Sequence, residues 1–199
     1  MRATRSWSRR RAPSSRPWAR GSCPRPRRGS GCSCTDVSGV PIYQTAILPE
    51  WIDYNGHLRD AYYVLIVSLA CDALMDRLRM DAAYRQRTLC TLYTVEMHIH
   101  YLHEVKATDT AIVAVRIAGA DHKRIHAAFE ILRAGHTPAA AAAEVMLLHV
   151  RRQPQAPTTT PFPAEVSAAI AQLRAATAGL PASVPGSRRM ELRGTTGAP

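Results

Sequence analysis

The chain has 199 residues, of which 46% are hydrophobic, and a formal net charge of +11. A chain of this length is expected to form one domain with tails, and its apolar content is sufficient for a core. It contains no apolar run of about 18 residues, which argues against a transmembrane helix. Its 5 cysteines include no CxxC pair, so a zinc ribbon and a disulfide framework are both disfavoured.

The positive charge is concentrated at the N-terminus. Ten of the 26 basic residues are arginines within residues 1–36, which contain one acid, whereas the rest of the chain carries 16 basic and 14 acidic residues. The folded part is therefore nearly neutral, and its charge does not predict a nucleic-acid partner. Because residues 1–38 are rich in Arg, Ser, Pro and Gly and poor in aliphatic residues, we expect them to form a disordered tail.

Three interpretations of this tail remain open. It is Arg- and Ser-rich like a transit peptide, although its four prolines would break an amphipathic helix. It is also basic enough to be an arm that binds nucleic acid, but no binding motif accompanies the charge. The third interpretation, a translation start assigned too far upstream in a GC-rich gene, fits best because the segment lacks a physical pattern.

The first predicted elements after the tail are a strand and a long helix. Alternation over residues 40–46 predicts the strand, and a polar loop at 50–59 follows it. With Asp60 as N-cap, residues 60–80 repeat apolar side chains at i, i+3, i+4 and i+7, which predicts an amphipathic helix. A short helix over residues 81–87 is also expected.

Strand patterns separated by turns follow, with no long helix between them. They cover residues 93–101, 111–117, 125–131 and 141–150. In the first of these strands we expect the odd-numbered residues, from Tyr93 and Val95 to Tyr101, on one apolar face. His98 and His100 lie on the other face, and since no third ligand accompanies them we expect no metal site. The alanines at 139–143 could nucleate a helix by propensity, but their position after a turn favours a strand.

The last predicted element is a helix with Pro163 at its first position. The expected organisation is thus a domain over residues 39–152, a linker and helix over 153–178, and a flexible tail over 179–199. Consecutive strands at short spacing pair antiparallel, and the long helix must cover one sheet face, which predicts an α+β roll. A doubly wound α/β sheet would need helices between the later strands, and none is predicted.

The loop before the long helix holds the residues best suited to chemistry. Asp53, Asn55, Gly56 and His57 fall within five residues, beside a helix N-terminus. A carboxylate can attack an electrophile or activate water, and the amides at a helix N-terminus can stabilise an oxyanion. Asn55 could orient water or a carbonyl, and His57 could hold Asp53. The same residues are also typical of an ordinary turn.

This element order, with the Asp-x-x-Gly-His motif of Asp53–His57 before the central helix, resembles the hotdog-fold acyl-CoA thioesterases of the 4-hydroxybenzoyl-CoA thioesterase type. More narrowly, Trp51–Leu58 with Asp60–Tyr63 is similar to thioesterases of carnitine and betaine breakdown. The resemblance implies a curved antiparallel sheet wrapped around the helix. It also implies hydrolysis of a short-chain acyl-CoA, with betainyl-CoA as one candidate, in the cytoplasm and without a cofactor. Active sites are expected between the subunits of a homodimer or homotetramer.

By this resemblance Asp53 is the catalytic carboxylate, acting as nucleophile or general base, and Gly56 and His57 occupy the next motif positions. The family often has Asn where Arg59 stands here. This departure leaves an alternative, a hotdog protein that binds acyl-CoA without hydrolysing it or that acts as an assembly scaffold. Aromatic faces suit a trimethylammonium group and cations suit the phosphates of coenzyme A. The expected substrate contacts are therefore Trp51, Tyr54, Gly56, Tyr62, Tyr63, Lys106, Lys123 and Arg124.

Overall fold

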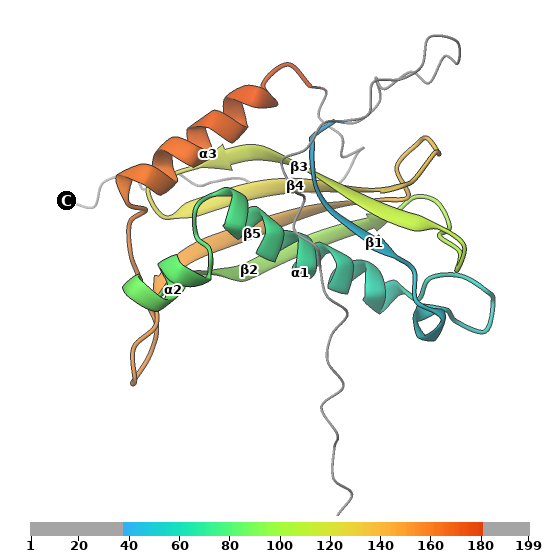
Figure 1. Cartoon of the computed structure of the whole chain (residues 1–199), viewed down its shortest axis with the longest axis horizontal. Helices are drawn as coiled ribbons and strands as arrows, with labels where there is room; N and C mark the ends of the chain where they lie inside the picture. The colour runs from blue at the N-terminus through green and yellow to red at the C-terminus, as the bar shows by residue number, and fades with distance from the viewer. Residues whose placement is uncertain (1–37, 181–199) are drawn as a thin grey trace, which may run out of the picture.

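The computed structural model describes residues 38–180, and the predicted tails at 1–38 and 179–199 lie almost entirely outside this range. Its main feature is one antiparallel sheet that curls around a long helix, α1 (Asp60–Arg77) (Figure 1). In sheet order the strands are β1 (Val40–Ala46), β3 (Thr110–Ala120), β4 (Arg124–Arg133), β5 (Ala141–Arg151) and β2 (Cys90–Tyr101). The predicted α+β roll is confirmed.

Smaller elements complete the fold. A 3-10 turn η1 (Pro49–Trp51) precedes the loop before α1, and a short helix α2 (Ala82–Thr88) leads into β2. A two-residue strand, β6 (Thr158–Thr159), lies in the predicted linker and pairs with β5. The last helix, α3 (Ala164–Ala176), packs on β3. No helix among residues 38–180 is both long and apolar enough to cross a membrane.

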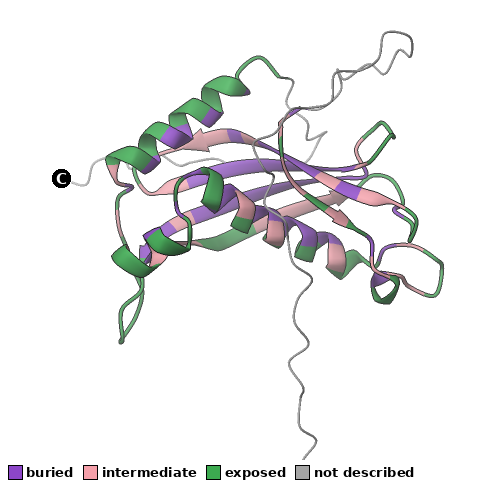
Figure 2. Ribbon diagram, viewed as in Figure 1, coloured by how far each residue is buried: buried purple, intermediate pink, exposed green. Residues whose placement is uncertain are grey.

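The core lies between α1 and the concave face of the sheet. Ile66, Ala70 and Leu74 on α1 are completely inaccessible to solvent. Phe129 on β4 and Leu147 on β5 are at most 1% exposed. Figure 2 shows this burial along the middle of the sheet and on one side of α1, whose opposite side is exposed. Since burying a large apolar side chain contributes about 1.5–3 kcal/mol, this face fixes α1 against the sheet.

The helix boundaries differ from the prediction by one to three residues. Asp60 is the first residue of α1, and the N-cap is Arg59, whose side chain makes no capping hydrogen bond. The helix ends at Arg77 because Arg79 adopts a left-handed conformation with φ of 64°, which stops the helix before Met80. Pro163 is likewise the N-cap of α3 and not its first residue.

The predicted alternation of β2 is wrong in its first half. Its pairing with β5 shifts between Thr94 and Glu96, so that Val95 is an extra residue in a β-bulge. One extra residue exchanges the two faces of a strand. Met97 therefore packs against the core as expected, whereas Tyr93 and Val95 are 40% and 55% exposed.

The last three residues of the run of alanines at 139–143 belong to a strand, as predicted. Ala141, Ala142 and Ala143 lie at the start of β5, and each is at most 1% exposed. Ala143 pairs with Phe129 on β4, and both side chains belong to the buried core. Tertiary packing thus decides against the helical propensity of alanine.

Replacing Leu74 by Ala tests the contact between α1 and the sheet. Leu74 is 0% exposed, so Leu74→Ala should lower the free energy of unfolding by about 2–5 kcal/mol in urea denaturation. The matched control is Leu65→Ala on the same helix, where the side chain is 38% exposed and a change within about 0.5 kcal/mol is expected. Equal effects of the two substitutions would contradict this placement of the core.

Candidate active site

The loop before α1 is a tight turn closed by backbone hydrogen bonds. The amide of Asp53 donates to the carbonyl of His57 at 2.8 Å, and the amide of Gly56 donates to the carbonyl of Asp53 at 3.1 Å. Ile52 and Leu58, on either side, form an antiparallel bridge. Gly56 has φ of 82°, a left-handed conformation that glycine adopts without steric cost. The turn expected from Asp-Tyr-Asn-Gly is therefore present.

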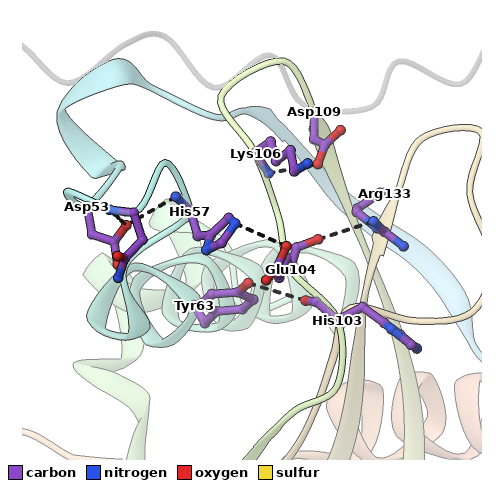
Figure 3. Close-up of polar contacts among 9 residues, drawn as sticks. Asp53, His57, Tyr63, His103, Glu104, Lys106, Asp109 and Arg133 are labelled. Atoms are coloured by element: carbon purple, nitrogen blue, oxygen red, sulfur yellow. Dashed lines mark hydrogen bonds and ion pairs between the residues drawn. The ribbon is translucent and has the colours of Figure 1, made fainter.

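The carboxylate of Asp53 is bound by the same turn. Its Oδ1 accepts hydrogen bonds from the amides of Asn55 at 2.8 Å and His57 at 3.1 Å (Figure 3). These bonds, that of His57 first, hold the pKa of Asp53 below its usual range, although partial desolvation acts in the opposite direction. Asp53 is therefore ionised at neutral pH. Both amides bind Oδ1. The second carboxylate oxygen of Asp53, Oδ2, therefore accepts no backbone hydrogen bond within residues 38–180.

The segment between β2 and β3 lies against this turn. The amide of Leu58 donates to the carbonyl of Val105 at 2.7 Å. Next to this bond, His57 Nε2 lies 3.0 Å from Glu104 Oε2, and the carbonyl of Glu104 accepts a hydrogen bond from Arg133 Nη1 at 3.2 Å (Figure 3). Residues distant in the sequence thus meet beside Asp53.

These segments surround a cavity of about 710 Å³. Among the residues singled out from the sequence, Asp53, His57, Tyr63 and Lys106 line it. The other lining residues come from the start of α1, the end of β2 and the segment after it, and the end of β4. They are Leu58, Arg59, Asp60, Tyr101, Leu102, His103, Glu104 and Arg133.

The N-terminus of α1 forms one wall of this cavity. The amides of Ala61 and Tyr62 are bound by Asp60 Oδ1 at 2.8 Å and by the carbonyl of Arg59 at 3.0 Å. The amide of Asp60 has no acceptor in the part of the chain that the structure describes. An unpaired amide at the positive end of a helix can receive a developing oxyanion. The cavity thus combines a carboxylate with a donor for a carbonyl oxygen.

The other predicted residues of the loop do not line the cavity. Trp51 is buried and stacks on Tyr62, with ring centroids 5.3 Å apart and an angle of 18° between the planes. Tyr54 is 94% exposed at the tip of the turn. Asn55 is exposed and contributes its backbone amide to Asp53. The Trp51–Tyr62 pair thus packs the loop against α1.

The predicted cation Lys123 lies in the turn between β3 and β4, and Arg124 is the first residue of β4, both at the other end of β3 from the cavity. Their amides donate to Asp121 Oδ1 at 2.9 and 2.7 Å, and the Arg124 guanidinium forms an ion pair with the same carboxylate at 2.6 Å. Within one subunit the structure does not bring these cations together with Asp53.

Most of the lining was not singled out as site residues by the sequence analysis, including the polar side chains of Tyr101, Glu104 and Arg133. Tyr101 was predicted only as part of a strand face, and its hydroxyl lies 3.5 Å from the carbonyl of Asp60. Glu104 and Arg133 belong to no motif. They reach the cavity through the pairing of strands and the bond between Leu58 and Val105, for which the sequence has no local signal.

Comparison with known proteins agrees with this geometry. The profile of the thioesterase-like superfamily matches residues 47–170. The chain belongs to this superfamily. A betainyl-CoA thioesterase of Pseudomonas aeruginosa is 42% identical over 142 residues, which cover 71% of this chain and 88% of that relative. An L-carnitine dehydrogenase/betainyl-CoA thioesterase of Rhizobium meliloti is 35% identical over 70% of this chain, but the match covers only 28% of that longer protein.

Solved structures share the fold. A Pseudomonas putida protein assigned to the thioesterases superposes with a TM-score of 0.66 at 40% identity, covering 78% of this chain and 98% of that one. A CoA-bound Staphylococcus aureus protein superposes with a TM-score of 0.65 at 23% identity, covering 78% and 97%. The hotdog fold and the assignment to the acyl-CoA thioester hydrolases, both predicted from the sequence, are confirmed for this thioesterase.

The lowered pKa of Asp53 predicts an acid-resistant activity. If the ionised carboxylate is the reactive form, the acid limb of kcat/KM should lie below the pH at which an ordinary aspartate protonates, because the pKa of Asp53 is lowered. A pH profile of kcat/KM, with circular dichroism at each pH to verify folding, measures this. A fall in kcat/KM centred at a pH of about 6.5 would instead show that the group whose protonation abolishes activity is a histidine.

Proposed function

We propose that this thioesterase hydrolyses betainyl-CoA to betaine and coenzyme A, as the name of its 42% identical Pseudomonas aeruginosa relative indicates for that protein. The observation that carries the proposal is the shared cavity of Asp53 and the unpaired amide of Asp60. A thioester needs both a nucleophile or activated water at its carbonyl carbon and a donor at its carbonyl oxygen. The reaction needs no cofactor, because the carboxylate and the amide supply these two functions.

In this mechanism the thioester carbonyl accepts a hydrogen bond from the amide of Asp60, at the positive end of α1. Asp53 then either attacks the carbonyl carbon, forming a mixed anhydride that water cleaves, or removes a proton from an attacking water. In both routes the C–S bond breaks and coenzyme A leaves as the thiolate. Removing an oxyanion donor costs about 2.7–4 kcal/mol in comparable enzymes.

The cations on the cavity wall suit the anionic part of the substrate. Arg59, Lys106 and Arg133 line the cavity together, and basic side chains bind phosphate groups through charge-assisted hydrogen bonds. At position 59 a backbone hydrogen bond holds the loop: the amide of Arg59 donates to the carbonyl of Trp51 at 3.0 Å. The side chain of Arg59 is not needed for this bond. The position often occupied by Asn in the family is therefore available here for a cation that faces the substrate.

The proposal extends to assembly and location. Among residues 38–180, β2 is an edge strand that pairs with β5 alone, and Tyr93 and Val95 on it are exposed. An exposed apolar edge favours pairing with another chain, so we propose that two copies associate along β2 in a homodimer or a homotetramer. The free thiols of Cys71 and Cys90 suit a reducing cytoplasm.

Asp53→Asn tests the function directly. With betainyl-CoA and a thiol-detecting reagent, kcat/KM should fall by about 10²–10⁴-fold, the range expected for the loss of a general base. The matched control is Asp81→Asn, because Asp81 Oδ1 also accepts a backbone hydrogen bond, from Tyr84 at 2.8 Å, at the N-cap of α2. Asn caps helices as well as Asp does, so this variant should keep wild-type turnover. Equal turnover of Asp53→Asn and wild type would remove Asp53 from the mechanism.

A charge on the edge strand tests the assembly. Val95→Lys should shift the protein toward the monomer in sedimentation-velocity experiments, since an edge lysine disfavours strand pairing. Leu180→Lys changes another exposed apolar residue, 36% accessible, outside the sheet and should leave the assembly unchanged. A wild-type protein that sediments as a monomer at all concentrations would refute the proposed association.

A further inference from the structure

The part of the cavity beyond His57 is lined by a carboxylate and two aromatic rings. Glu104 contacts His57 Nε2 through Oε2 at 3.0 Å, and its side chain is 63% exposed. The rings of Tyr63 and Tyr101 pack edge to face, with centroids 5.2 Å apart and an angle of 84° between the planes. Both rings and Glu104 line the same cavity as Asp53.

These groups lie close to the proposed reaction centre. His57 contacts Asp53 through its backbone amide at 3.1 Å and Glu104 through its ring at 3.0 Å, so one residue separates the two carboxylates (Figure 3). The hydroxyl of Tyr101 lies 3.5 Å from the carbonyl of Asp60, the residue whose amide would bind the thioester. The space beside Asp53 is therefore also lined by Glu104 and the two rings.

The charges on the cavity wall are mixed. Three carboxylates (Asp53, Asp60 and Glu104) and three cations (Arg59, Lys106 and Arg133) line the cavity together. A neutral acyl chain would gain nothing from a carboxylate at its end. A substrate with a cation at the acyl end and phosphates at the other end would use both signs of charge.

We propose that Glu104, with the exposed ring of Tyr101 that packs on buried Tyr63, contacts a quaternary ammonium on the acyl group and so selects cationic over neutral short-chain thioesters. This inference rests on the proposed hydrolysis of betainyl-CoA. In that substrate the ammonium nitrogen is two covalent bonds from the thioester carbon. When the thioester lies beside Asp53, the ammonium is therefore no farther from Asp53 than the neighbouring side chain of His57 extends. A quaternary ammonium binds over aromatic faces, and a nearby carboxylate adds attraction that a neutral isostere cannot use.

The test compares betainyl-CoA with 3,3-dimethylbutanoyl-CoA, in which carbon replaces the ammonium nitrogen and the shape is retained. The measured quantity is the ratio of kcat/KM for the two substrates. For wild type this ratio should exceed about 10, and Glu104→Gln should lower it at least about tenfold. Tyr101→Leu should lower the same ratio by a smaller factor.

Glu165→Gln provides the matched control. Glu165 is an exposed carboxylate in the first turn of α3, outside the cavity lining and not on β2. This variant should keep the wild-type ratio. An unchanged ratio in Glu104→Gln, with both substrates affected alike, would show that Glu104 only positions His57 and would overturn the inference.

Wild-type behaviour separates this inference from the proposed function. Equal hydrolysis of the two substrates by wild type would refute the cation selection and leave thioester hydrolysis by Asp53 standing. Hydrolysis of neither substrate would refute both the proposed function and the inference. Because Glu104 is an exposed loop residue, circular dichroism should show that Glu104→Gln folds like wild type.

Discussion

Two backbone amides of a single turn bind the carboxylate of Asp53, and the chemistry of the cavity depends on this short-range constraint. The turn requires a residue at Gly56 that tolerates φ of 82°, and it places Asn55 and His57 so that both amides meet Oδ1. The carboxylate is thereby kept ionised and directed, before any substrate arrives. A group held in this way loses little conformational freedom when a ligand binds, which is how pre-organisation favours reaction.

The remainder of the domain serves to place this turn. α1 is fixed against the concave face by fully buried side chains such as Leu74, and its first residue opens onto the cavity. The hydrogen bond between Leu58 and Val105 ties the turn to the segment after β2, which brings Glu104 to His57. The site is therefore shared between a helix start, a turn and the end of a strand.

Features encoded locally could be predicted from the sequence, and features that arise from pairing could not. The order of strands and helices followed from periodicity, and the turn at Asp53–Gly56 followed from its composition. The bulge at Val95 could not be foreseen, because one extra residue leaves the pattern of residue types intact while exchanging the faces. For the same reason Glu104 and Arg133 were missed as site residues: only the register of β3 and β4 and the contact at Val105 place them.

The aromatic residues illustrate the same division. Four aromatic side chains near the motif were equal candidates in the sequence, yet only Tyr63 lines the cavity, since Trp51 and Tyr62 stack on each other and Tyr54 is exposed. Tyr101, from a strand distant in sequence, lines the cavity with Tyr63. Whether a side chain lines the cavity is decided by how the elements pack, and a single sequence does not state this packing.

A crystal structure of the Asp53→Asn variant with uncleaved betainyl-CoA would test the central claim most directly. The account predicts the thioester carbonyl oxygen at a hydrogen-bond distance of about 2.9 Å from the amide of Asp60, with the carbonyl carbon next to the side chain at position 53. A thioester bound with its carbonyl away from the start of α1, or outside the cavity lined by Asp53, would contradict the account.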